Sequence, residues 1–251
     1  AIFGELTSNR NEMLFWMILI SVLGLIVCSM GLQNGVEKMT KFMMSSLFVI
    51  MLILVVRATT LDGAIDGLKF YLLPDFGKMA ENGFKEAVFA AMGQSFFTLS
   101  VGIGALAIFG SYIGKERRLT GEAISITVLD TVVALVAGLI IFPSCFAFDV
   151  NPGQGPGLVF VTLPNVFREM AGGRIWGALF FLFMSFAAFS TIIAVFQNII
   201  QFARDMWGIS LKKSVLINGV LLILLAVPCV LGMTDWAGFS IGGKNIMDIE
   251  D

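Results

Sequence analysis

Three small groups of polar residues stand inside otherwise apolar stretches of the sequence. Gln94 and Thr98 are four residues apart, so on a helix they share one face, and Phe97 and Ser100 share the next. Hydroxyl, amide and backbone oxygens suit a hard cation that prefers oxygen ligands, and the aromatic ring supplies an apolar wall. None of these residues is a nucleophile paired with a base. The first group therefore favours ion binding over covalent catalysis.

Asp130 is the second feature, a carboxylate inside the run ISITVLDTVVALVAGLIIF. An ionised Asp at mid-bilayer costs about 2.5 to 3.5 kcal/mol on insertion scales, so it normally faces a partner or a cavity. An intramembrane aspartyl protease needs two carboxylates that share a proton, and the apolar runs contain only this one. We expect no enzyme, and we expect Asp130 to serve a binding site. A purely structural Asp is the alternative.

The third group is the adjacent pair Ser190 and Thr191 in FMSFAAFSTIIAVFQ, with Ala187 one turn before Thr191. Small residues on one stripe allow close helix approach, and two neighbouring hydroxyls could add cation ligands. Hydroxyls in membrane helices also bond back to their own carbonyls, so a structural role for the pair stays open.

Membrane helices must position these groups. Hydrophobic residues make up 57% of the 251 and charged residues 14%, against about 25% charged in an average soluble domain. We therefore expect an all-α integral membrane protein in contact with lipid. Six runs are about long enough to span a bilayer with some tilt, and they comprise residues 14–31, 42–60, 87–113, 124–148, 175–200 and 215–231. Arg57, near the end of the second run, can snorkel to the interface.

The third run, with the central stretch AMGQSFFTLSVGIGALAIFGSY, is long enough to cross the bilayer but is poorly built for an unbroken helix. Thr98, Ser100, Gly102 and Gly104 stand near its middle, and the glycines weaken a helix. Irregular backbone at membrane depth is tolerated where it is buried in protein or lines a cavity, and an interrupted span points to a transporter site. We therefore predict a discontinuous third helix. Glycines that only permit close helix packing are the alternative.

Lys and Arg are concentrated in alternate loops, which predicts the orientation. Three short loops hold Lys38, Lys41, Lys115, Arg117, Arg118, Arg204, Lys212 and Lys213, and the positive-inside rule places them in the cytoplasm. Both ends of the chain are then expected outside, as part of a longer protein, since the sequence starts at Ala1 without a methionine. The outer loop of residues 149–174 carries an apolar pattern that predicts a short helix near Pro164, acting as a lid or resting on lipid headgroups.

Other classes of site have little support. Cys28, Cys145 and Cys229 lie in or beside separate apolar runs without CxxC spacing, and histidine is absent. Structural metal and redox sites are therefore not expected. The net charge of −2 is spread over loops and does not indicate a nucleic-acid partner.

Several segments resemble the neurotransmitter:sodium symporters, the sodium-coupled amino-acid and amine transporters of the bacterial leucine-transporter type. They are GLQNGVEKMTKFMMSSLFVI, GLKFYLLPDF, GQSFFTLSVGIGALAIFGSY, FVTLPNVF and FSTIIAVFQNIIQFARD, in family order. The resemblance implies a 5+5 inverted repeat in the cell membrane, the inner membrane in bacteria. Residues 14–31 resemble its fourth span and residues 215–231 its ninth. The missing half would carry the first broken helix and most contacts to the substrate carboxylate.

The resemblance also implies roles for individual residues. Thr98 and Asp130 look like ligands of a first sodium ion, and the Ala187 carbonyl with the Ser190 and Thr191 hydroxyls like ligands of a second. Residues that look like the pocket for an amino acid or related amine are Phe97, Ser100, Ile103, Thr191 and Val195. Residues expected to form or support the gate and the helix break are Gln94, Gly102, Gly104, Tyr112 and Asp205.

Two departures from the family pattern carry consequences. Ile103 stands where several relatives place an aromatic ring against the substrate, which leaves the preferred side-chain size open. Asp130 supplies fixed negative charge where chloride-dependent relatives have a neutral residue, so we expect chloride independence. The implied function is sodium-coupled symport by alternating access. The alternative is a transport-inactive truncated membrane module or an accessory subunit.

Overall fold

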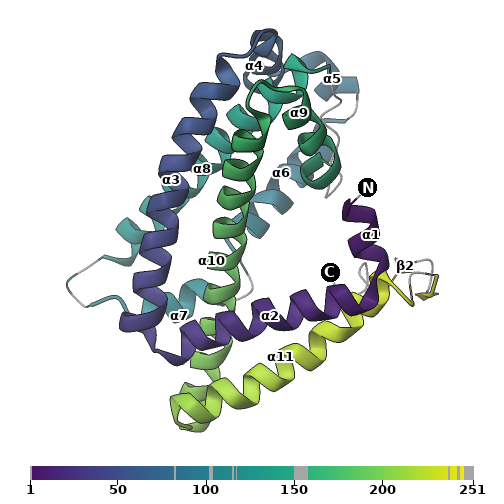
Figure 1. Ribbon diagram of the computed structural model, residues 1–251. Helices are drawn as coiled ribbons and strands as arrows, with labels where there is room; N and C mark the ends of the chain where they lie inside the picture. Colours follow the sequence, from purple (N-terminus) through teal and green to yellow (C-terminus); the bar gives the residue numbers. More distant parts are fainter. Residues whose placement is uncertain are drawn as a thin grey trace. The chain divides into compact units, whose positions relative to one another are not determined.

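The structure is a computed structural model that describes residues 2–81, 83–101, 104–114, 116, 118–149, 158–236, 238–241 and 244–245. Helices dominate these residues (Figure 1). They are α1 (Ile2–Ser8), α2 (Arg10–Ser29), α3 (Glu37–Thr59), α4 (Ala64–Leu72), α5 (Phe76–Glu81), α6 (Phe84–Thr98), α7 (Ala105–Ser111), α8 (Leu119–Ala147), α9 (Leu163–Glu169), α10 (Gly173–Trp207) and α11 (Leu211–Met233). Single π-helical turns, Leu32–Val36 and Leu158–Thr162, precede α3 and α9, and β1 (Ser240–Ile241) pairs antiparallel with β2 (Lys244–Asn245).

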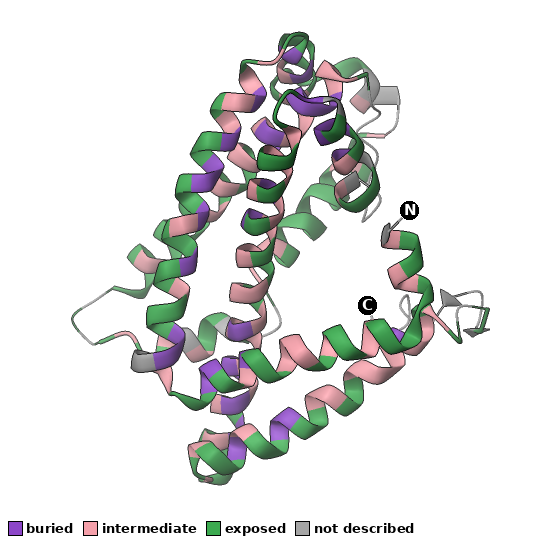
Figure 2. Ribbon diagram, viewed as in Figure 1, coloured by how far each residue is buried: buried purple, intermediate pink, exposed green. Residues whose placement is uncertain are grey.

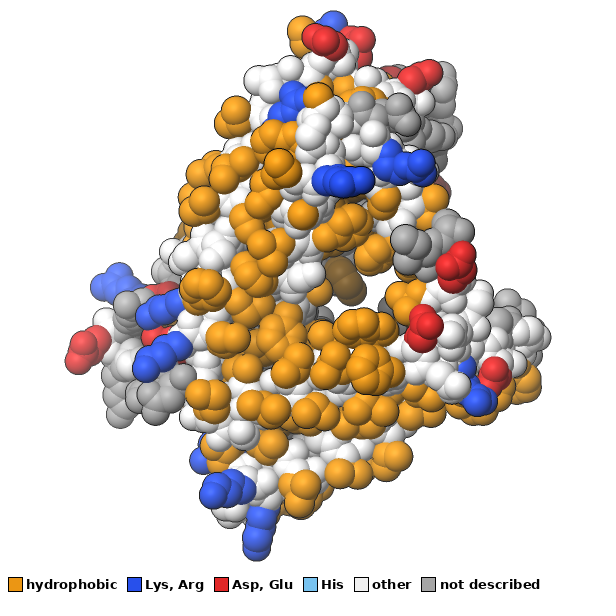
Figure 3. Space-filling view, in the orientation of Figure 1, with side chains coloured by type: hydrophobic (Ala, Val, Ile, Leu, Met, Phe, Trp, Pro, Cys, Tyr) orange, Lys and Arg blue, Asp and Glu red, His pale blue; other side chains and the backbone are white. Residues whose placement is uncertain are grey.

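Five of the described helices, α2, α3, α8, α10 and α11, are long and apolar enough to cross a membrane. The sequence predicts about six spans, and the difference lies in the third apolar run. That run is divided between α6 and α7, and each is shorter than the roughly 20 residues that a span requires. Apolar side chains cover much of the visible surface (Figure 3), as expected where helices meet lipid.

The chain divides into two compact units, and the long helices α3 and α10 contribute to both. Unit 1 comprises residues 1–44 and 186–251, and unit 2 comprises residues 45–185.

In unit 1, α2 and α11 pack side by side and antiparallel (Figure 1). Gly219 of α11 makes room for Leu25, because a Cβ at this glycine would lie only 2.8 Å from the Leu25 side chain. Near the other end of the pair, Arg10 forms a 2.8 Å salt bridge with Asp235. Both groups of this bridge are about half exposed, so it contributes little stability.

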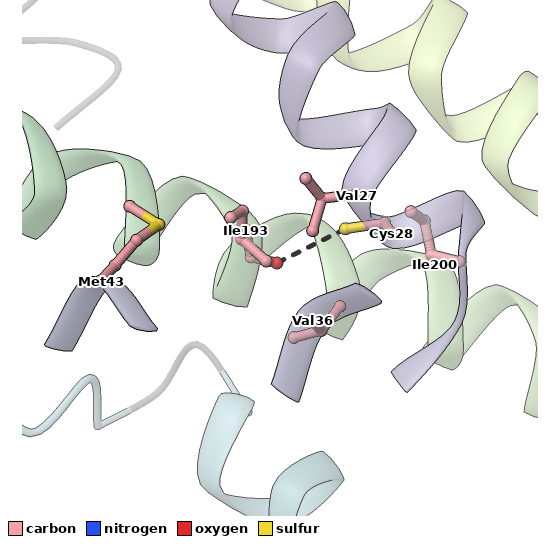
Figure 4. Close-up of a cluster of buried hydrophobic side chains, with 6 residues drawn as sticks. All are labelled: Val27, Cys28, Val36, Met43, Ile193 and Ile200. Atoms are coloured by element: carbon pink, nitrogen blue, oxygen red, sulfur yellow. Dashed lines mark hydrogen bonds between the residues drawn. The ribbon is translucent and has the colours of Figure 1, made fainter. Parts of the chain in front are cut away.

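A buried cluster joins α2, the start of α3 and α10 in unit 1 (Figure 4). Its members are Val27, Cys28, Val36, Met43, Ile193 and Ile200. The Cys28 thiol donates a hydrogen bond to the Ile193 carbonyl at 3.7 Å, and no disulfide joins the three cysteines, all of which lie in described residues. Figure 2 shows how few residues of α11 are buried, in contrast to this cluster. Because Cys28 is fully buried within the cluster, it packs as a small apolar side chain.

In unit 2, α4 packs on the second half of α8. The Tyr71 ring stacks on Phe142 with centroids 4.7 Å apart, and Phe70 contacts Phe142 and Phe146. Two glycines permit this approach, since a Cβ on Gly67 or Gly138 would collide with the facing helix. Burial here raises the pKa of the Tyr71 phenol.

The start of α10 packs against α9, also in unit 2. Phe167 of α9 contacts Phe180 with ring centroids 5.4 Å apart, and both side chains are buried. Pro164 is the second residue of α9, which directly follows the π-helical turn Leu158–Thr162. A Cβ on Gly173 would collide with the Phe167 carbonyl, so a glycine is needed where α10 begins.

Candidate functional site

The break between α6 and α7 is formed by a specific arrangement of backbone hydrogen bonds. The helix α6 ends at Thr98, and Ser100 adopts the left-handed conformation with φ of 53°. The Val101 N–H donates to the Phe96 carbonyl at 2.9 Å, and the Ser100 N–H donates to the Phe97 carbonyl at 3.0 Å. These are the two hydrogen bonds of a Schellman motif, whose left-handed position usually holds glycine. Here that position holds serine.

Gly104 forms the other edge of the break. Its φ is 78°, and its carbonyl accepts hydrogen bonds from the N–H groups of Ala107 and Ile108 in the first turn of α7. The sequence places Thr98, Ser100, Gly102 and Gly104 near the break and predicts that the glycines weaken the helix. In the structure, Ser100 closes the last turn of α6. Gly102 and Ile103 lie outside the described residues, so their expected roles stay predictions.

Gln94 and Thr98 lie together at the end of α6, as their spacing predicts. The Gln94 Nε2 donates to the Thr98 Oγ1 at 3.1 Å, which fixes the hydroxyl oxygen near the end of the helix. The last turn also presents Phe97, whose side chain is 79% exposed within the described chain. The end of α6 thus offers an oriented hydroxyl beside an aromatic ring.

A cavity of about 540 Å³ lies between the break, α7 and the first half of α8. Leu99 and Val101 line it from the break, and Ile126 and Thr127 line it from α8. Asp130 lies about one turn beyond Ile126 and Thr127 on the same helix and is partly buried. Within the described part of the chain, its carboxylate has no hydrogen bond or ion pair.

Three oxygens gather within one turn of α10. The Ala187 carbonyl accepts hydrogen bonds from Ser190 Oγ at 2.9 Å and from Thr191 Oγ1 at 3.1 Å. The Ser190 hydroxyl also lies 3.9 Å from the Met44 sulfur, and Val195 follows one turn after Thr191. Both hydroxyls thus bond back to a carbonyl, the structural alternative that the sequence leaves open, and their lone pairs stay available as acceptors.

No cluster of three or more His, Cys, Asp or Glu side chains suited to a metal ion exists among the described residues. Any cation held here would therefore depend on hydroxyl and carbonyl oxygens with few carboxylates. Such a ligand set suits an alkali cation better than zinc, which is held by Cys, His and carboxylate ligands.

The carboxyl end of α10 carries a polar ladder that sequence reasoning did not assign beyond Asp205. Gln201 Nε2 donates to Asp205 Oδ1 at 2.8 Å, and Arg204 Nη1 donates to Gln201 Oε1 at 2.9 Å. Gln197, one turn earlier, is 2% exposed, and its Oε1 is buried without a partner in the described chain. Polar residues three and four positions apart in the sequence were the signal that could have predicted this ladder. Tyr112, the other predicted gate residue, directly follows α7.

A second unpredicted polar contact joins α10 to α11 in unit 1. Ser214 Oγ donates to the Ile200 carbonyl at 2.8 Å, and Asn218 Nδ2 donates to Ser214 Oγ at 3.1 Å. Ser214 and Asn218 are both buried. Their spacing of four residues in an apolar helix is the signal that could have identified them.

The predicted pocket residues divide between the two units. Phe97 and Ser100 belong to unit 2, and Thr191 and Val195 belong to unit 1. Of the predicted sets, the structure brings together Gln94 with Thr98, and Ala187 with Ser190 and Thr191.

Comparisons with known proteins agree with this membrane architecture. The sequence profile of the Sodium:neurotransmitter symporter family matches residues 7–242. A sodium-dependent transporter of Haemophilus influenzae is 35% identical over 245 residues, which are 97% of this chain and 53% of that protein. The sodium-dependent transporter YhdH of Bacillus subtilis is 32% identical over 251 residues, 100% of this chain and 55% of that protein.

A solved structure is similar over almost the whole chain. The crystal structure of MhsT in complex with L-phenylalanine superposes with a TM-score of 0.86 at 35% identity, covering 99% of this chain and 56% of that one. The chain thus spans about half the length of the curated relatives it matches.

Proposed function

The chain belongs to the sodium:neurotransmitter symporter family, and from this membership we propose that it forms part of a sodium-coupled amino-acid symporter that works by alternating access. The family is one of transporters rather than enzymes. The observation that carries the proposal is the break between Thr98 and Ala105 within an apolar run. Broken helices are the usual binding elements of such transporters because they expose backbone dipoles and oxygens at membrane depth.

The end of α6 has the electrostatic character that a cation requires. The carboxyl end of a helix carries the partial negative charge of the helix dipole, and Thr98 presents its hydroxyl there. The Gln94 amide holds this oxygen in place through the 3.1 Å hydrogen bond. We assign a first sodium ion to Thr98 and Asp130, whose carboxylate would offset the charge of the ion.

We assign a second sodium ion to the Ala187 carbonyl and the Ser190 and Thr191 hydroxyls of α10. Their oxygens already lie within 3.1 Å of the carbonyl oxygen. A bound cation would replace the hydrogen bonds from the two hydroxyls to the Ala187 carbonyl with ion–oxygen contacts. The helical turn would not need to refold for this exchange. The fixed negative charge of the Asp130 carboxylate would take the place of a chloride ion, which supports transport without chloride.

An amino-acid substrate is supported by the similarity to MhsT, whose crystal structure contains L-phenylalanine. Phe97, Ser100, Ile103, Thr191 and Val195 are the proposed pocket residues. Tyr112 and Asp205 are the proposed residues of the inner gate and its support, and the hydrogen bond from Gln201 orients the Asp205 carboxylate. We place Lys38, Lys41, Lys212 and Lys213 on the cytoplasmic side by the positive-inside rule.

The test is uptake by the protein expressed from its natural reading frame and reconstituted into liposomes. An inward sodium gradient should drive accumulation of labelled L-phenylalanine or L-leucine. Thr98→Ala, Asp130→Ala and Thr191→Ala should each weaken the sodium dependence of substrate binding. Thr59→Ala is a matched control, since Thr59 also bonds back to a helical carbonyl, that of Val55, but lies outside the proposed sites.

Two results would count against the proposal. Unchanged sodium dependence in all three variants would remove the ion assignments. Absence of any sodium-driven uptake by folded protein would favour an inactive membrane module or an accessory subunit.

A further inference from the structure

One face of α3 forms a groove with α10 in unit 2 that the proposed transport site does not use. Its volume is about 410 Å³, and its lining residues are Leu52, Ile53, Val56, Arg57, Thr60 and Trp176. Four of these residues belong to α3 and recur at helical spacing, so they form one stripe, and Thr60 directly follows the helix. The opposite stripe of α3, which includes Leu47, Leu54 and Ala58, is buried. The groove therefore lies on the face of α3 that points away from this buried stripe.

The groove is polar at one end and apolar along the rest. Leu52, Ile53 and Val56 are 47%, 44% and 65% exposed. From Leu52 to Thr60 the helix rises about 12 Å, with Arg57 and Thr60 at the carboxyl end, where α3 stops. The arrangement matches a phospholipid, whose phosphate lies at the membrane surface and whose acyl chain runs into the hydrocarbon.

Arg57 supplies the charge that such a ligand needs. Its guanidinium carbon lies 5.6 Å from the centroid of the Trp176 ring. Within the described part of the chain, no carboxylate lies at ion-pair distance from it. Thr60 Oγ1 donates to the Arg57 carbonyl at 3.0 Å, so the hydroxyl proton is already used. The guanidinium thus provides the donors, and its planar fork fits phosphate oxygens.

We propose that this groove binds an anionic phospholipid, with its phosphate on Arg57 beside Trp176 and an acyl chain along Leu52, Ile53 and Val56. A free phosphate ion would use Arg57 but leave the apolar stripe uncovered. Tryptophan at a membrane interface fits the same geometry, because its ring is apolar and its N–H is polar. The site shares no residue with the proposed sodium ligands.

The experiment is fluorescence quenching of the protein, expressed from its natural reading frame and reconstituted in phosphatidylcholine vesicles. The probes are phosphatidylglycerol and phosphatidylcholine brominated near the headgroup end of the acyl chain. The difference between the protein and Trp176→Phe isolates the Trp176 signal. Brominated phosphatidylglycerol should quench this signal at lower mole fraction than brominated phosphatidylcholine. A cation at a membrane surface contributes about 1 kcal/mol, so Arg57→Gln should reduce the preference about fivefold.

The controls distinguish charge, fold and ligand source. Arg57→Lys should retain part of the preference, and Arg118→Gln, which removes an exposed arginine elsewhere in unit 2, should retain all of it. Excess inorganic phosphate should not reverse the quenching. Equal quenching by both lipids in the protein and in Arg57→Gln would overturn the proposal. So would displacement of the lipid by phosphate, or a Trp176 that neither lipid quenches because protein covers the groove.

Discussion

The Val101 N–H and the Phe96 carbonyl oxygen lie 2.9 Å apart, and this hydrogen bond closes the last turn of α6 around Ser100. Ser100 therefore occupies a left-handed position at φ of 53° that costs an ordinary L-residue about 1 to 2 kcal/mol. The end of the helix at membrane depth is thus held by local hydrogen bonds against local strain.

Ser100→Gly should raise the stability of the protein, because glycine adopts this conformation without a steric penalty. We expect a gain of about 0.5 to 1 kcal/mol in the free energy of unfolding, measured as a higher thermal midpoint in detergent. Ser95→Gly is the matched control, since Ser95 lies inside α6 and glycine there should lower stability by about 0.5 kcal/mol. A loss of stability in both variants would argue against the left-handed assignment.

Gln94→Ala should weaken sodium binding without abolishing it. Gln94 acts on the proposed ion through Thr98, so its loss removes one hydrogen bond of about 0.5 to 1.5 kcal/mol, equivalent to about 2- to 10-fold in apparent sodium affinity. Sodium titrations of substrate binding measure this change. Combined with Thr98→Ala, the Gln94 change should have little further effect, and full additivity would show that the two residues act independently.

Gly138→Ala should loosen the packing of α4 on α8. A Cβ on Gly138 would collide with the Tyr71 ring, and overpacking of this kind typically costs about 1 to 3 kcal/mol. Gly121→Ala, near the start of the same helix, has no atom within 4 Å of the added Cβ and should be neutral or slightly stabilising. The thermal midpoints of the two variants in detergent test the contrast. Equal midpoints would mean that α4 does not press on α8 at Gly138.

The sequence predicts the helix break well because that signal is local. Four polar or small residues in one apolar run indicate an interruption, and the spacing of Gln94 and Thr98 predicts their contact. The mechanism of the break was not predictable in this way. Glycine is the usual left-handed residue, so the serine at position 100 carries no comparable signal.

Contacts between distant segments were harder to foresee. Phe70 and Tyr71 pack on α8 because Gly67 and Gly138 open space that only the paired helices reveal, so the sequence of α4 alone does not predict this contact. For the same reason, the polar contact between Ser214 and Ile200 could not be read from either helix alone. The joint action of Thr98 and Asp130 on one ion stays a prediction, since it depends on packing rather than on spacing.

Asp130→Asn should make transport depend on chloride. Two sodium ions would bring two positive charges to the site, and the Asp130 and substrate carboxylates would offset them. Without the Asp130 charge, an anion from solution must take its place, so uptake in gluconate should fall about tenfold or more below uptake in chloride, equivalent to about 1.4 kcal/mol. Uptake of labelled amino acid at a fixed sodium gradient measures this ratio. Asp66→Asn removes an exposed carboxylate paired with Lys69 on α4 and should leave the ratio at one. Equal uptake by Asp130→Asn in both anions, with unchanged sodium dependence, would mean that Asp130 does not offset the charge of the sodium ions.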